Sequence, residues 1–157
     1  MKILILFMFF IASVAVYGQS DFSGSWKLNV PKSEFNEIPG TPFQSLMSVE
    51  LKDGTISYRR NENPKETLKI GDTSGIEINN KDFEGGKTRV FMKLSSDKKG
   101  LVETREYTYP DTETAIVASR KIRTWTLSTD KKVLTITDQI EATNGDTYVM
   151  VLVYDKQ

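Results

Sequence analysis

The stretch that decides the fold is Asp21-Phe22-Ser23-Gly24-Ser25-Trp26-Lys27-Leu28. From Gly24 onward it alternates polar and apolar residues, which is the pattern of a β-strand with one buried face. A Trp at the start of a first strand is a large apolar plug, suited to seal one end of a small barrel. We therefore expect this stretch to open an antiparallel β-barrel, with Trp26 as its plug.

The residues before this stretch have the anatomy of a secretory signal peptide. Residues 1–18 contain one Lys near the start, an apolar run from Ile3 to Val16 and a small-residue exit that ends at Gly18. The run is shorter than the roughly 20 residues that a spanning helix needs, and no comparable run follows it. We predict a signal peptide at 1–18 and an exported domain at 19–157, periplasmic or secreted, with no integral membrane segment in the mature chain.

Composition excludes several kinds of chemistry. The 157-residue chain has no Cys and no His, so disulfides, thiol or imidazole catalysis and imidazole metal sites are impossible within it. Without Lys2, 20 Lys and Arg residues face 21 acidic residues, and this net charge of −1 argues against a nucleic-acid partner. The acidic residues form no recognisable motif for catalysis or calcium binding. We expect a non-enzyme, with no catalytic residue, metal or cofactor.

The mature chain reads as a series of short strands. Segments rich in Val, Ile, Thr, Tyr and Phe alternate with turn residues such as Asp53-Gly54 and Asn144-Gly145, which favour tight hairpins between consecutive strands. The expected strands lie near 24–30, 44–52, 55–60, 66–70, 75–79, 87–95, 101–109, 114–127, 132–141 and 146–155. A single up-and-down antiparallel barrel of eight to ten strands fits with the fewest assumptions, because closure removes exposed edges. A two-sheet sandwich is the alternative.

The motif of Gly24 and Trp26 resembles the first strand of the lipocalin and fatty-acid-binding-protein superfamily, in which the Trp packs across the barrel floor. Segments 125–127, 132–136 and 153–156 are spaced like the last three strands of such proteins, including exported bacterial lipocalin-like domains. The resemblance covers the mature chain and implies a lipocalin-like barrel that holds a small molecule.

The same resemblance implies roles for a few residues, and at one position this sequence departs from the family pattern. Lipocalins place an Arg or Lys from a late strand across the motif Trp, and Arg123 or Arg120 could fill that role for Trp26. Fatty-acid binders often carry Arg-x-Tyr on the last strand to hold a carboxylate; here Tyr154 matches, but Leu152 replaces the Arg. The residues expected to close the barrel are Gly24, Trp26 and Arg123.

The strand at 101–109 raises a question of orientation. It puts Glu103, Arg105 and Tyr107 on one face, because successive side chains of a strand point to opposite sides. A buried Arg is costly unless it is paired. An inward Arg105 would therefore hold an anionic ligand or bond to Glu103 or another internal acid; the alternative is that this face points outward.

Several other strands carry apolar residues at alternate positions, which form either a packed core or the lining of a ligand cavity. The candidate ligand-binding residues are Tyr58, Met92, Arg105, Tyr107 and Tyr148. The sequence thus predicts an exported protein that holds a small apolar or amphipathic ligand inside a β-barrel without chemical turnover. The alternative is a packed barrel that serves as an interaction or structural module of the cell envelope.

Overall fold

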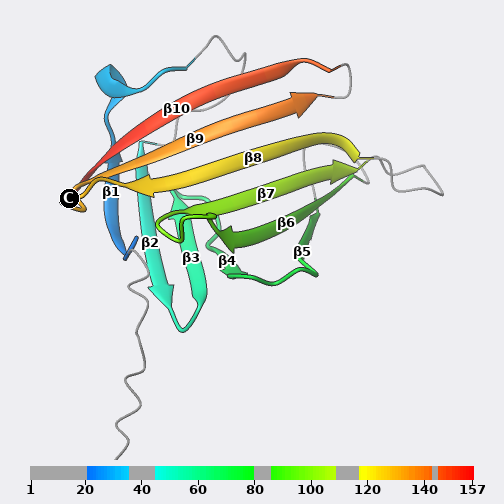
Figure 1. Ribbon diagram of the computed structural model, residues 1–157, viewed down its shortest axis with the longest axis horizontal. Helices are drawn as coiled ribbons and strands as arrows, with labels where there is room; N and C mark the ends of the chain where they lie inside the picture. Colours follow the sequence, from blue (N-terminus) through cyan, green and yellow to red (C-terminus); the bar gives the residue numbers. More distant parts are fainter. Residues whose placement is uncertain (1–20, 36–44, 80–85, 109–116, 143–144) are drawn as a thin grey trace, which may run out of the picture.

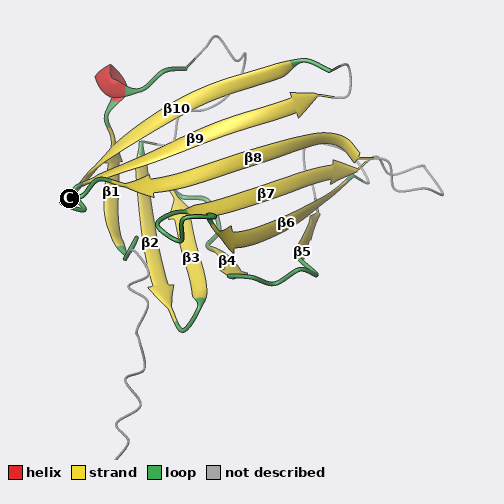
Figure 2. Ribbon diagram, in the orientation of Figure 1, coloured by secondary structure: helices red, strands yellow, loops and turns green. Residues whose placement is uncertain are grey.

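The structure, a computed structural model, describes residues 21–35, 45–79, 86–108, 117–142 and 145–157. The strands, shown in Figure 1, are β1 (Gly24–Leu28), β2 (Leu46–Lys52), β3 (Thr55–Arg60), β4 (Glu66–Lys69), β5 (Ile76–Asn79), β6 (Lys87–Leu94), β7 (Leu101–Thr108), β8 (Val117–Leu127), β9 (Val133–Ala142) and β10 (Thr147–Lys156). One 3-10 turn, η1 (Val30–Lys32), follows β1 (Figure 2). The predicted signal peptide at 1–18 lies outside the described residues.

The ten strands form one antiparallel sheet that nearly closes on itself. Consecutive strands pair antiparallel, except for β4 with β5, and β1 also pairs with β10. The order is therefore β4-β3-β2-β1-β10-β9-β8-β7-β6-β5. Strands β6 to β10 form one layer, and β2 and β3 run across it in the other (Figure 1). The predicted up-and-down barrel is confirmed, with ten strands.

The sheet stays open between β4 and β5, the two ends of the strand order. Here the described residues form no ladder. Ile70, just after β4, makes a single parallel bridge to Met92 on β6, and the Gly71 amide donates to the Met92 carbonyl at 2.7 Å. These backbone contacts connect the segment after β4 to β6 across the opening.

Turn chemistry explains the hairpins. Asp53 and Gly54 have φ angles of 49° and 71°, as the predicted tight turn between β2 and β3 requires. Two further hairpins share one turn sequence, LSSDKKGL at 94–101 and LSTDKKVL at 127–134. In each of them a Ser hydroxyl donates to the Asp two residues later, at 2.5 and 2.6 Å, and the second Lys amide donates to the same Asp. The two turns are built alike and join β6 to β7 and β8 to β9.

Aromatic side chains seal the end of the barrel at which these two turns lie, and we call it the closed end. Trp26 on β1 and Trp125 on β8 are fully buried. The Trp26 Nε1 donates to the Phe22 carbonyl at 3.0 Å, and the Phe22 ring meets Trp125 edge-on with the ring centroids 6.5 Å apart. The opposite end, where Tyr148 begins the inward face of β10 and is 44% exposed, is the open end.

The cation over Trp26 differs from the expected one. Lys156 places its Nζ 5.3 Å from the centre of the Trp26 ring. Arg123 is committed to Asp138 inside the barrel, and Arg120 pairs on the outer side with Glu106. Lys156 therefore takes the place over Trp26 that was expected for Arg123 or Arg120, because it lies opposite Trp26 in the ladder of β1 and β10.

Gly24 allows this contact between Lys156 and the first strand. Its φ of 144° is one that other residues rarely adopt, and a Cβ placed there would lie 2.9 Å from Lys156 Cε. We expect Gly24→Ala to lower the free energy of unfolding by about 2 kcal/mol through backbone strain. Urea denaturation would measure it, with Ser25→Ala on the exposed side of the same strand as the control. A Gly24→Ala protein as stable as the control would contradict this account.

Candidate functional site

Inward-facing side chains cross β6 to β10 in rows set by the strand register. The first of these rows lies toward the closed end, is apolar and contains Leu101, Trp125, Ile136 and Leu152. The second row contains Met92, Glu103, Arg123, Asp138 and Met150, and the third contains Val90, Arg105, Lys121, Ile140 and Tyr148. Charged groups thus lie side by side on neighbouring strands, above an apolar floor.

Seven charged side chains make up what we call the internal charged layer: Arg60, Glu66, Glu103, Arg105, Lys121, Arg123 and Asp138. They come from both layers of the barrel, because Arg60 and Glu66 belong to β3 and β4. Strand alternation positions each of them, since each occupies the face on which its strand also carries buried residues.

Asp138 anchors one side of the layer. It accepts from Arg123 at two points, Nε at 2.6 Å and Nη2 at 2.7 Å, and Lys121 Nζ lies 2.7 Å from it. Burial alone would raise the pKa of Asp138, but the two cations outweigh burial and hold this pKa below its ordinary value. Asp138 is therefore ionised at neutral pH although it has no exposed surface.

Arg105 anchors the other side. Its Nε donates to Glu103 at 2.6 Å, and its Nη2 donates to the Tyr58 hydroxyl at 2.7 Å and to Glu66. Burial opposes its charge, yet Glu103, Tyr58 and Glu66 together raise the pKa of Arg105 above its ordinary value. This contact resolves the orientation of the strand predicted at 101–109, because Glu103 and Arg105 face the interior and are paired there.

The charges of the layer are unequal and are arranged by depth. With all groups ionised, the layer has four cations and three carboxylates. Burial raises the pKa of Glu103, and the net charge of the layer becomes more positive whenever Glu103 is protonated. Two of the carboxylates, Glu103 and Asp138, have fully buried side chains. The side chains of Arg60, Arg105 and Lys121 are 11%, 15% and 16% exposed. Solvent therefore meets these three cations together with Glu66, whose side chain is 28% exposed, and Glu103 and Asp138 lie beneath them.

Buried donors without a hydrogen-bond partner also outnumber such acceptors in the layer and directly below it. Arg60 Nη2, Arg123 Nη1 and Trp125 Nε1 are buried and lack a hydrogen-bond partner among the described residues, as does one acceptor, Glu103 Oε2. The two guanidinium groups lie 3.8 Å from Glu103 oxygens, too far for a hydrogen bond. The interior is thus short of acceptor atoms.

The five candidate ligand-binding residues take different places. Tyr58 and Met92 are buried, and Tyr58 belongs to the hydrogen-bonded cluster of Arg105. Arg105 and Tyr148 share the third row, and Tyr107 faces the same way one row closer to the open end. Arg105, Tyr107 and Tyr148 therefore lie on the solvent-accessible side, whereas Met92 packs into the core.

Sequence reasoning missed four members of the layer: Arg60, Glu66, Lys121 and Asp138. A signal for Asp138 exists, because it interrupts an inward apolar alternation of Leu134, Ile136 and Ile140. Likewise Lys121 lies two and four residues before the inward Arg123 and Trp125. A charged residue at an inward position of an alternating apolar strand is therefore the sequence pattern that indicates the internal charged layer.

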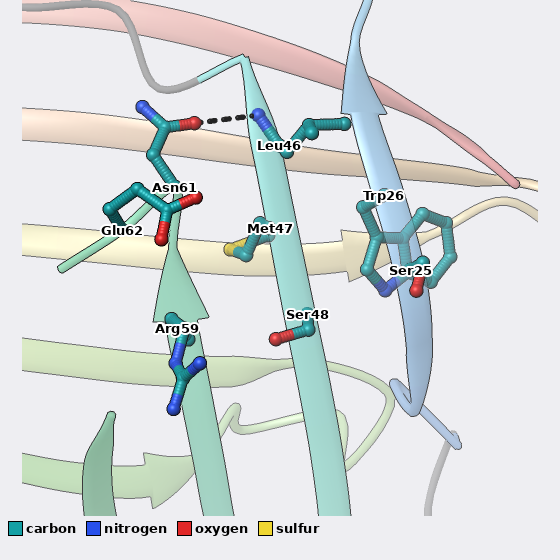
Figure 3. Close-up of a pocket in the computed structure, with 8 residues that line it drawn as sticks. All are labelled: Ser25, Trp26, Leu46, Met47, Ser48, Arg59, Asn61 and Glu62. Atoms are coloured by element: carbon teal, nitrogen blue, oxygen red, sulfur yellow. Dashed lines mark hydrogen bonds between the residues drawn. The ribbon is translucent and has the colours of Figure 1, made fainter. Parts of the chain in front are cut away.

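Pockets on the outer surface are less suited to ligand binding than the internal charged layer is. One of about 230 Å³ lies over β1 to β3 and is lined by Ser25, Trp26, Leu46, Met47, Ser48, Arg59, Asn61 and Glu62 (Figure 3). In it Asn61 Oδ1 accepts from the Leu46 amide at 3.0 Å. Its charged members, Arg59 and Glu62, are exposed and opposite in sign. We therefore take the internal charged layer as the candidate site.

The described residues include neither a metal-binding cluster nor a membrane-spanning helix. No group of three or more His, Cys, Asp or Glu residues there is placed to hold a metal ion. None of the helices described between residues 21 and 157 has the length and apolar character needed to cross a membrane.

The Asp138 contacts make a stability prediction. Asp138→Asn removes the carboxylate that Arg123 and Lys121 share, and we expect it to lower the free energy of unfolding by about 3 kcal/mol at pH 7. The native pKa lies below the ordinary 3.8, so the ionised Asp138 stabilises the fold above that pH and its contribution is lost as the pH falls through the native value. Urea denaturation should show the gap between variant and wild type closing in acid.

The control is Glu77→Gln, which breaks an exposed pair with Lys87 and should change stability little. A gap between Asp138→Asn and wild type that stays constant down to pH 2 would contradict the role of the ionised carboxylate.

Comparison with known proteins supports the fold. No protein-family model and no curated protein matches the sequence. Among solved structures, the zebrafish ileal bile acid-binding protein in complex with cholic acid matches with a TM-score of 0.55 and 15% identity, over 87% of this chain and 98% of that one. At this identity the likeness shows the fold alone. The chain has a calycin-like β-barrel fold, as the resemblance at Gly24 and Trp26 implied.

Proposed function

We propose that this protein binds a small amphipathic molecule in the open half of the barrel, with the polar end of the molecule directed onto the internal charged layer. The observation that carries the proposal is the arrangement of charges by depth: three cations, Arg60, Arg105 and Lys121, and one acid, Glu66, reach solvent, while Glu103 and Asp138 are buried beneath them. Cations on the accessible side and unpaired donors favour a polar end that is anionic or accepts hydrogen bonds. The molecule is bound and released unchanged.

The closed half of the barrel has a different role. Side chains fill this half, because Trp26, Trp125, Leu101, Leu134 and Ile136 are at most 1% exposed. A guest is therefore confined to the open side of the charged layer. There Tyr107, Ile140 and Tyr148 offer it apolar surface, at roughly 25 cal/mol per Å² buried.

The filled half also gives weight to a second function, that of a packed interaction module. Its specific support is the burial of Met92 and Tyr58, two residues expected to line a cavity. The two functions differ in one measurable respect, the uptake of a small molecule. Native mass spectrometry of the exported protein, compared with the denatured chain, would detect a guest carried from the host.

Lys121 is the variant that best tests the proposed site. Lys121→Met removes a cation from the accessible side but leaves Asp138 paired with Arg123. We expect about tenfold weaker binding of 8-anilinonaphthalene-1-sulfonate, since a hydrogen bond to a charged group is lost, and unchanged binding of neutral N-phenyl-1-naphthylamine. Probe fluorescence would measure both affinities.

Lys93→Met, on the outward side of β6, is the matched control and should bind both probes like the wild type. Equal losses for both probes in Lys121→Met would show that Lys121 shapes the barrel without recognising charge. Uptake of neither probe by the wild type would favour the packed module.

We also propose export, on the strength of the signal-like residues 1–18. Expression of the full chain in an exporting bacterial host should give a mature protein that begins at Gln19. N-terminal sequencing would test this, and a protein that keeps residues 1–18 would contradict it.

A further inference from the structure

Glu66 differs from the two other carboxylates of the charged layer. The side chains of Glu103 and Asp138 have no exposed surface, whereas that of Glu66 is 28% exposed, more than any other member of the layer. It is also the acid that touches Arg105 on the accessible side, because the Glu103 contact lies beneath. An anion that approaches Arg105 from solvent therefore meets Glu66 first.

The contacts of Glu66 are those that a bound anion would make. Its Oε2 accepts from Arg105 Nη2 and from the Tyr58 hydroxyl, the latter at 3.0 Å. Arg105 remains paired with Glu103 through its Nε, at 2.6 Å, so its charge does not depend on Glu66 alone. Glu66 can thus leave without stranding the guanidinium.

The place of Glu66 in the fold makes such an exchange feasible. It begins β4, the end strand of the sheet, which pairs with β3 and is followed by the bridge of Ile70 to Met92 on the far layer. The ion pair to Arg105 on β7 spans strands that are not neighbours in the sheet. Release of Glu66 breaks a side-chain contact across the open part of the barrel and leaves every backbone ladder intact.

We infer that Glu66 is a built-in competitor for the ligand: in the empty barrel it occupies Arg105, and the anionic end of a bound molecule takes its place. This inference rests on the proposed function and names the residue that sets its selectivity. Glu66 weakens the binding of every anion, since each must displace it, and has no such effect on neutral guests.

Replacement of Glu66 by Gln tests the inference, because Gln keeps the shape and removes the charge. We expect Glu66→Gln to bind 8-anilinonaphthalene-1-sulfonate about tenfold more tightly than the wild type does, and N-phenyl-1-naphthylamine equally well. The matched control is Glu50→Gln, which removes a carboxylate paired with Lys65 at 2.9 Å on the outer face. It should change neither affinity.

A second variant guards against a folding defect. Glu66→Asp keeps the charge but draws the carboxylate back from Arg105, so it should give a smaller gain for the anionic probe, again with no change for the neutral one. Thermal unfolding of each variant establishes that the barrel is intact.

The results separate this inference from the proposed function. Unchanged or weaker anion binding in both variants, with the wild type still binding the probe, would overturn the competitor role and leave the binding function standing. Equal gains for both probes would also overturn it, because Glu66 would then only block space. Uptake of neither probe by wild type and variants would overturn both.

Discussion

The bidentate pairing of Arg123 with Asp138 is the contact on which the interior of this barrel depends. Both groups lie on adjacent strands with almost no exposed surface, and each would carry a large desolvation cost alone. Lys121 adds a second cation to the same carboxylate, and Glu103 lies beside Arg123 in the register. The row of charges can exist because the ladder brings these positions together on one face.

The apolar floor strengthens this ion pair and also raises the cost of leaving either charge without a partner. Trp26, Trp125 and Phe22 exclude water from the closed end, so the charged layer has a dry region below it. In such surroundings a charge without a partner is expensive and a paired one is strongly held. The same burial raises the pKa of Tyr154, on the neighbouring strand β10, to about 12, so that its hydroxyl stays neutral. The charged layer is therefore closely paired on its buried side and reaches solvent on the other.

The sequence alone was sufficient for the architecture. Alternation and turn chemistry predicted all ten strands to within a few residues, because hairpin turns such as Asp53-Gly54 carry their own geometry. The cation predicted to lie over Trp26 differs from the observed one for a reason of register. Lys156 and Arg123 are both plausible by residue type, and only the pairing of β1 with β10 decides which of them reaches Trp26. Contacts between strands far apart in the chain cannot be read from local pattern.

The same limit explains the candidate site. Arg105 was suspected from its own strand, but Glu66 lies 39 residues away on a strand that does not neighbour β7 in the sheet, so nothing in the local sequence joined them. The resulting arrangement has a physical logic. Buried acids hold the accessible cations in place, which spares a ligand the cost of ordering them. A surplus of one cation then leaves the layer attractive to an anion, while its own carboxylates limit how strongly any anion is held.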